Sequence, residues 1–193
     1  GGGSMNDIWG WTDPEFGTEY VLLGRTSGTA FVDISDPVNP IYLGNLPTYS
    51  SNSSWRDIKV DGNYAYVVSE ASGHGMQVFD LTKLREYYDK PSAFVRQLAH
   101  GVLYAEVTSV HNIIINEQTG FGYLVGSKTC SGGLHVVDLS TPIAPRFVGC
   151  FSADGYTHDS QCVIYDGPDA NYRGKEICFN YNEDTLTIVD VSD

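Results

Sequence analysis

The amino-acid sequence predicts an all-β protein of short antiparallel strands, and three observations support that fold class. Aromatic and β-branched runs recur along the chain, separated by turns rich in Gly, Asn and Asp. Gly (21) and Tyr (13) are abundant while Met (2) is rare, a mixture that favours strands and tight turns over helices. One short phrase also returns at fairly regular intervals, which indicates that the strands belong to a repeat.

The repeated phrase is two apolar residues, an Asp, a further apolar residue and then Ser or Thr. Its four copies span residues 31–35, 78–82, 136–140 and 188–192. An apolar run precedes each copy across a tight turn, as in a β-hairpin, at 19–23, 64–68, 121–125 and 176–179. A shorter element with Asp or Asn in second place precedes each hairpin: Asn6-Asp7-Ile8, Arg56-Asp57-Ile58, His111-Asn112-Ile113 and His158-Asp159-Ser160.

A fourth strand follows the phrase after a Pro-bearing turn, as at residues 36–43. Four short strands in each unit of about fifty residues are typical of a β-propeller blade. We expect blades at approximately 6–50, 51–105, 106–155 and 156–193, preceded by an added linker at residues 1–5. The sole helix candidate runs from Leu81 to Tyr88.

The fourth unit stops after its third strand, so about 3.75 blades are present, whereas propellers usually have four to eight. We therefore expect a fragment of a larger propeller, with the remaining blades supplied by a longer chain or a second chain. A strand edge that is exposed, or filled by a partner, is expected at residues 186–191.

The charge of the chain restricts its partners. The net charge is −13, with 11 Lys and Arg dispersed among 24 Asp and Glu. Such a surface lacks the basic face that nucleic acid requires, and it disfavours anionic lipid for the same reason. It suits cations, calcium above all, or it serves solubility alone. No apolar run approaches the roughly 20 residues of a membrane-spanning helix, so we predict no transmembrane segment.

The repeated phrase resembles the LVIVD repeat. Longer strings, at residues 55–58, 110–113, 155–162 and 182–190, resemble the choice-of-anchor B family of secreted bacterial propellers. The resemblance covers nearly all of residues 6–193 and is strongest from about residue 105 onward. It implies an exported protein, secreted or at the cell surface, from a family whose full domain is longer and often carries a C-terminal anchor. Because that family has no settled activity, the resemblance implies a fold and a compartment rather than a reaction.

The first strand of each propeller blade lines the central channel, and its start faces one mouth of that channel. Seven side chains are thereby placed together as candidates for ligand or metal binding: Asp7, Arg56, Asp57, His111, Asn112, His158 and Asp159. Gathered carboxylates repel each other unless Arg56, a protonated His or a hard cation such as calcium lies among them. Alternatively, these side chains satisfy backbone groups and hold the inner strands in register. Ligation of a transition metal by the two histidines is a further alternative, although two are few for a site.

Three oxygen-bearing side chains in one loop, Asp166, Asp169 and Asn171, form a second candidate calcium site. The spacing is not that of an EF-hand, and Asp and Asn also favour turns. The aspartates of the repeated phrase are expected to cap the turns that follow them. His74, His100 and His135 are expected to be ordinary surface or packing residues. No motif for a nucleophile with its base, a zinc protease or a phosphate loop is present.

The four cysteines, Cys130, Cys150, Cys162 and Cys178, allow three pairings. Cys162 and Cys178 lie on neighbouring strands of the fourth unit, and Cys130 and Cys150 bracket one strand of the third. We predict the bridges Cys130–Cys150 and Cys162–Cys178. Free thiols would suit a cytosolic protein, and the export implied by the family resemblance favours disulfides.

Two functions are compatible with these patterns. The first is an extracellular or cell-surface binding module that recognises a protein or glycan, with a cation such as calcium as added stabiliser. The alternative is a metal-dependent enzyme that uses the axial His and Asp residues at the channel mouth. The first is favoured because no complete catalytic group is visible. A residue type repeated in every blade is also more typical of scaffolding than of acid–base chemistry, whose members must differ.

Overall fold

The structure is a computed structural model that describes residues 3–87 and 97–192. Its strands form four antiparallel sheets in which neighbouring strands are consecutive in the chain, and this confirms the predicted all-β propeller-type fold. The first sheet contains β1 (Met5–Thr12), β2 (Glu19–Arg25), β3 (Gly28–Asp33) and β4 (Ile41–Pro47). The second contains β5 (Arg56–Asp61), β6 (Tyr64–Ser69), β7 (Met76–Asp80) and β8 (Val102–Tyr104).

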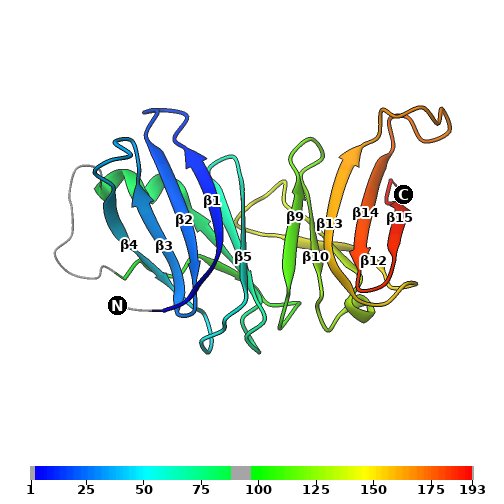
Figure 1. Cartoon of the computed structure of the whole chain (residues 1–193), viewed down its shortest axis with the longest axis horizontal. Coiled ribbons are helices and arrows are strands. Elements are labelled where there is room, and N and C mark those ends of the chain that lie inside the picture. The colour runs from blue at the N-terminus through cyan, green and yellow to red at the C-terminus, as the bar shows by residue number, and fades with distance from the viewer. Residues whose placement is uncertain (1–2, 88–96, 193) are drawn as a thin grey trace.

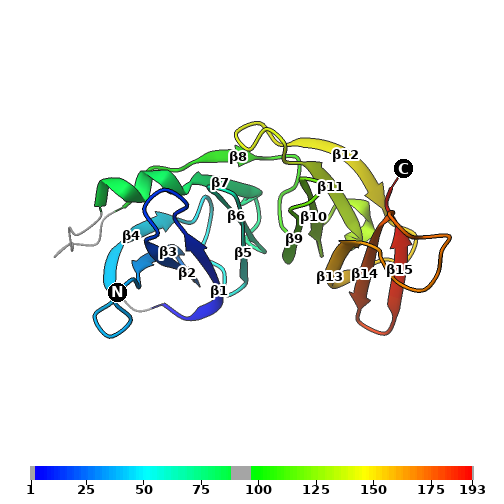
Figure 2. The ribbon, with the colours of Figure 1, turned by 90° about the horizontal axis from the view of Figure 1, so that it is seen from above.

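The third sheet contains β9 (Asn112–Asn116), β10 (Phe121–Val125), β11 (Leu134–Asp138) and β12 (Arg146–Phe151). The fourth contains β13 (Thr157–Ile164), β14 (Glu176–Asn182) and β15 (Leu186–Asp190), so β15 is an edge strand among the described residues. Figure 1 shows the sheets side by side, and Figure 2 shows them following an arc with β8 and β12 on its outer side. The first strands of successive sheets, β1, β5, β9 and β13, contact one another in series. We call these four the inner strands.

The predicted helix is wound more tightly than an α-helix. Residues Leu81–Tyr87 form the 3₁₀ helix η1, and Tyr88 lies outside the described residues. Leu81 and Leu84 are buried because residues three apart share one face of a 3₁₀ helix. A second 3₁₀ turn, η2 (Cys130–Gly132), joins β10 to β11. Among the described residues, no helix has the length and apolar character that crossing a bilayer demands.

The hydrophobic core lies in the spaces between neighbouring sheets. Successive side chains of a strand point to opposite faces, so a central sheet buries apolar residues on both sides. In β6, Val67 packs against the first sheet. At the same interface, Phe31 of β3 stacks on Phe79 of β7, with 5.0 Å between the ring centroids. Tyr66, the neighbour of Val67, packs with residues of the third sheet, including Ile113. This two-sided burial explains why the strands of the middle sheets are continuous apolar runs.

The face of the fourth sheet that points away from the third sheet is more exposed than the equivalent faces of the other three sheets. One position of the repeat holds Leu22, Tyr66 and Tyr123 in the first three sheets, and all three are buried against the next sheet. The equivalent residue of β14 is Phe179, which is only half-buried. Its cross-strand partner Ile188 is 63% exposed. Because β15 also has no partner beyond β14 among the described residues, the expectation of an exposed strand edge at residues 186–191 agrees with the structure.

Candidate functional site

A cavity of about 660 Å³ lies where the inner strands meet, and side chains from all four sheets line it. We call it the channel-mouth cavity. All seven side chains that the sequence placed at the mouth line this cavity: Asp7, Arg56, Asp57, His111, Asn112, His158 and Asp159. They meet there because they occupy two adjacent positions of the repeat, close to the start of each inner strand.

Asp7 and Asp57 connect each inner strand to the next one. Asp7 Oδ2 accepts a hydrogen bond from the backbone N–H of Ile58 at 2.8 Å, and Asp57 Oδ2 accepts one from Ile113 N–H at 2.8 Å. Asp57 Oδ1 also accepts from the N–H of Ile58 at 3.0 Å. Both aspartates therefore act as the sequence alternative proposed, by satisfying backbone groups and fixing the register between sheets.

The cation beside Asp57 is Lys59, whose Nζ lies 2.7 Å from Oδ1. The two residues share a face of β5 because they are two positions apart. Burial raises the pKa of Asp57 to about 6, and the negative charge of Asp7 adds to that rise, whereas Lys59 and the bond from Ile113 N–H oppose it. Sequence reasoning considered Arg56 for this role and missed Lys59.

Arg56 is buried and its guanidinium is turned to other partners. It donates to the carbonyl of Arg25 at 3.1 Å, to Thr48 Oγ1 at 2.9 Å and to His74 Nε2 at 2.8 Å. Because Arg only donates, His74 Nε2 must accept, and its Nδ1 donates to the carbonyl of Gly75. Burial lowers the pKa of His74 to about 4, so this packing residue is neutral near pH 7.

Asn112 and Asp159, the residues of the other two inner strands at the position of Asp57, are less enclosed than Asp57. Asp159 accepts the N–H of Ser160 at 2.8 Å, just as Asp57 accepts that of its own neighbour. Within the described residues, no inner strand follows β13 to donate to the second oxygen of Asp159, and the residue is exposed. Asn112 holds the same place in β9 and is half-buried.

The two histidines of the cavity face each other. His111 Nε2 lies 3.0 Å from His158 Nε2, and His111 Nδ1 lies 2.6 Å from Glu70 Oε1. His158 sits where the pairing of β13 with β14 shifts register between Thr157 and Asp159, and such a bulge re-aims a side chain. Glu70 follows β6 in a loop outside the repeated phrases, so no sequence signal pointed to it.

Aromatic rings surround this pair. The His111 ring centroid lies 6.4 Å from that of Trp55 and 6.3 Å from that of Tyr156. Trp55 is 55% exposed and lines the cavity. Trp9 lines it as well, with Lys59 Nζ 4.6 Å from its ring centroid. The mouth therefore combines indole faces with polar and charged groups.

Two other groups of candidate residues from the sequence lie in the loop at 166–172 and at the turns after the repeated phrases. In the loop at 166–172, Asp169 accepts from both the N–H and the side-chain amide of Asn171, at 3.0 Å each, which is an ordinary turn contact. Calcium binding by Asp166, Asp169 and Asn171 stays a prediction. Each aspartate of the repeated phrase accepts the N–H of the residue two positions later, and this confirms the predicted caps: Asp33, Asp80, Asp138 and Asp190.

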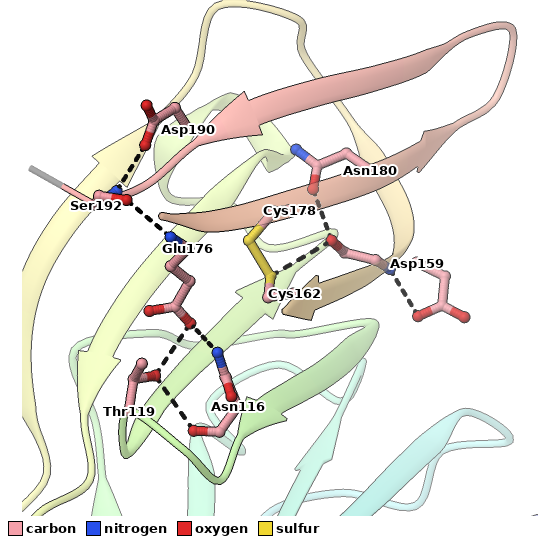
Figure 3. Close-up of a disulfide and its surroundings, with 10 residues drawn as sticks. Asn116, Thr119, Asp159, Cys162, Glu176, Cys178, Asn180, Asp190 and Ser192 are labelled. Carbon is pink, nitrogen blue, oxygen red and sulfur yellow. Dashed lines mark hydrogen bonds between the residues drawn. A yellow bond between two sulfur atoms is a disulfide. The ribbon is translucent and has the colours of Figure 1, made fainter. Parts of the chain in front are cut away.

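Both predicted disulfides are present, Cys130–Cys150 and Cys162–Cys178. Cys162 and Cys178 are directly opposite in the β13–β14 register and are buried against the third sheet. Figure 3 shows this bridge beside Glu176, whose Oε1 accepts from Asn116 Nδ2 at 2.6 Å. The bridge joins β13 to β14 within the fourth sheet, and the hydrogen bond between Asn116 and Glu176 connects that sheet to the third.

Across residues 3–87 and 97–192, no three His, Cys, Asp or Glu side chains are grouped as ligands of one ion would be.

Residues 24–48 and 54–73 match the profile of the LVIVD repeat, so the predicted resemblance to this repeat is confirmed. These segments contain β3 and β4 of the first sheet and β5 and β6 of the second. No curated protein matches the chain. The resemblance to the choice-of-anchor B family stays a prediction.

Proposed function

We propose that this chain is a binding module of an exported β-propeller and that its channel-mouth cavity binds a carbohydrate. The observation that carries the proposal is the cavity itself, about 660 Å³ with the exposed indole of Trp55 at its wall. Sites for small ligands typically measure about 300–1,000 Å³ and combine aromatic surface with a few polar groups. A concave site of this size suits a few sugar rings better than the face of a folded protein.

The chemistry of the lining favours a sugar over an apolar ligand. A sugar ring has an apolar C–H face that stacks on an indole, and it has hydroxyl groups that require donors and acceptors at its edge. Trp55 supplies the flat surface, and Asn112, Asp159 and Gln161 line the same cavity with polar side chains. Hydroxyl groups both donate and accept, so they suit this mixture of amide and carboxylate partners.

An extracellular location is part of the proposal. Disulfides form and persist in oxidising compartments, and the chain contains two. A net charge of −13 suits a protein that stays soluble outside the cell. Stabilisation by calcium, at the channel mouth or in the loop at 166–172, stays a prediction of the same proposal.

The proposal also includes a neighbour for the fourth sheet. The repeat position that packs on the next sheet elsewhere holds Phe179, and beside it Leu186 and Ile188 are exposed. Asp159 holds the position from which Asp57 binds the next inner strand. We propose that a further blade of the same repeat, from a longer chain or a second chain, packs here.

Glycan binding is testable directly. A glycan array should identify a binder, and calorimetric titration with that glycan should give a weaker complex for Trp55→Ala, by about fivefold to tenfold for the loss of one aromatic contact. Tyr49→Ala is the control, because Tyr49 is also an exposed aromatic residue but does not line the cavity. An array without any binder, or an affinity that Trp55→Ala leaves unchanged, would contradict the proposal.

A further inference from the structure

Two histidines from adjacent inner-strand segments point at each other in the channel-mouth cavity, with Nε2 atoms 3.0 Å apart. One of them is held from behind by a carboxylate, since Glu70 Oε1 lies 2.6 Å from His111 Nδ1. We propose that His111 and His158 bind one divalent transition-metal ion through these Nε2 atoms, with Glu70 as the residue that orients His111. The remaining coordination positions face the cavity and are left for water or a ligand.

The separation of the two nitrogens fits two ligands of one ion. Imidazole nitrogens bind such metals at about 2.0–2.1 Å, and at that length atoms 3.0 Å apart subtend about 94° at the ion. Tetrahedral ligands would lie about 3.3 Å apart, whereas neighbouring ligands of a tetragonal ion lie near 90°. Tetragonal sites with nitrogen and oxygen ligands are typical of Cu²⁺ and Ni²⁺, and Cu²⁺ binds most tightly in the divalent series.

The hydrogen bonds fix which nitrogen of His111 is available. A carboxylate only accepts hydrogen bonds, so His111 Nδ1 carries a proton and donates a hydrogen bond to Glu70. The lone pair of His111 Nε2 can therefore accept a hydrogen bond or bind a metal ion. Without metal, His158 Nε2–H donates to that lone pair. When metal binds, this proton moves to His158 Nδ1, so both Nε2 lone pairs face the ion and no proton is gained or lost. A carboxylate behind a ligating histidine is a recurrent partner of protein metal sites.

The local backbone supports this arrangement at both histidines. His158 occupies the register shift of β13, which turns its side chain differently from its neighbours. A Cβ at Gly126, whose φ is +61°, would lie 2.5 Å from His111 Cβ, so only glycine leaves room for His111. The same repeat position in the first two sheets holds Asn6 and Arg56. Among the four sheets, histidine therefore occupies this position of the repeat only in the third and the fourth.

The inference does not depend on carbohydrate binding, because the metal is measured alone. The untagged chain should bind one Cu²⁺ by calorimetric titration in a non-coordinating buffer, with an electron paramagnetic resonance spectrum showing coupling to two imidazole nitrogens. His111→Ala and His158→Ala should each weaken binding at least tenfold. Glu70→Gln should weaken it by about tenfold to 100-fold while the two-nitrogen signature is retained.

His100→Ala is the matched control, because His100 is an exposed histidine outside the cavity, and it should leave the affinity unchanged. The double variant His111→Ala/His158→Ala measures the background, including any copper held by the N-terminal amine. Circular dichroism and thermal unfolding establish that each variant is folded, and His158→Gln provides a second polar replacement at the more exposed position. Copper held by the double variant as tightly as by the unaltered chain, or a spectrum without imidazole coupling, would overturn the proposal.

Discussion

The buried carboxylate of Asp57 gives the stability of this protein a specific dependence on pH. Its pKa is raised from the ordinary value of 3.8 to about 6, chiefly by desolvation. Because the folded pKa lies above the unfolded one, the folded state binds this proton more tightly. The contribution of Asp57 to stability is therefore fully present below about pH 4 and is lost as the pH rises through about 6. At 1.36 kcal/mol per pKa unit, the loss amounts to about 3 kcal/mol by pH 7.5.

Replacing Asp57 by Asn removes this titration and keeps one acceptor oxygen. Loss of the second acceptor, which serves Ile113 N–H or Ile58 N–H, costs about 1–3 kcal/mol at every pH. The informative quantity is the change with pH. From pH 4 to pH 7.5, the free energy of unfolding of Asp57→Asn should rise by about 2 kcal/mol relative to the unaltered chain, because part of the total effect is already lost at pH 4. Urea unfolding at a series of pH values, with the disulfides intact, measures it.

Asp159→Asn is the control, because it removes the same charge at the equivalent but exposed position of another inner strand. Subtracting its pH profile from that of Asp57→Asn corrects for the general effect of lowering the net negative charge. Parallel profiles for the two variants would refute the reasoning. They would mean that Lys59 and the two backbone N–H groups offset the desolvation of the Asp57 carboxylate completely.

Two further predictions concern the fourth sheet. Replacing Cys162 and Cys178 together by Ala should lower the free energy of unfolding by about 3 kcal/mol, since the bridge closes a loop with a sequence separation of 16. A loss below about 1 kcal/mol in urea unfolding would argue against that bridge. Leu186→Ser combined with Ile188→Thr should change the free energy of unfolding by no more than about 1 kcal/mol, because both side chains are exposed. Urea unfolding measures this change, and a large loss of stability would show that these residues are packed.

The repeat made most of the fold predictable. Alternating apolar runs located the hairpins, and the Asp within each repeated phrase predicted a turn cap because that contact is local. The Cys162–Cys178 bridge followed from the hairpin that places the two residues opposite each other. The channel-mouth residues could be grouped for the same reason, since an equal place in each repeat becomes an equal place around the channel.

Contacts outside the repeat were beyond the reach of the sequence. Glu70 lies in the loop after β6 of the second sheet and contacts His111 at the start of the third sheet, a contact that no local pattern encodes. Arg56 was expected among the carboxylates, but it is buried with His74, and Lys59 is the cation beside Asp57. These choices depend on which side chain reaches a partner at the lowest desolvation cost, and that is decided only by the packed geometry.

The joints that Asp7 and Asp57 make between inner strands have an evolutionary consequence. Each joint uses a side chain from one blade and a main-chain amide from the next, and every residue type except proline carries that amide. The joint therefore constrains the side chain of its acidic member alone, and on the receiving strand it requires only a residue other than proline. At this contact, a blade added or exchanged by gene duplication needs no matching side chain in its neighbour, although the apolar packing between sheets must still be complementary.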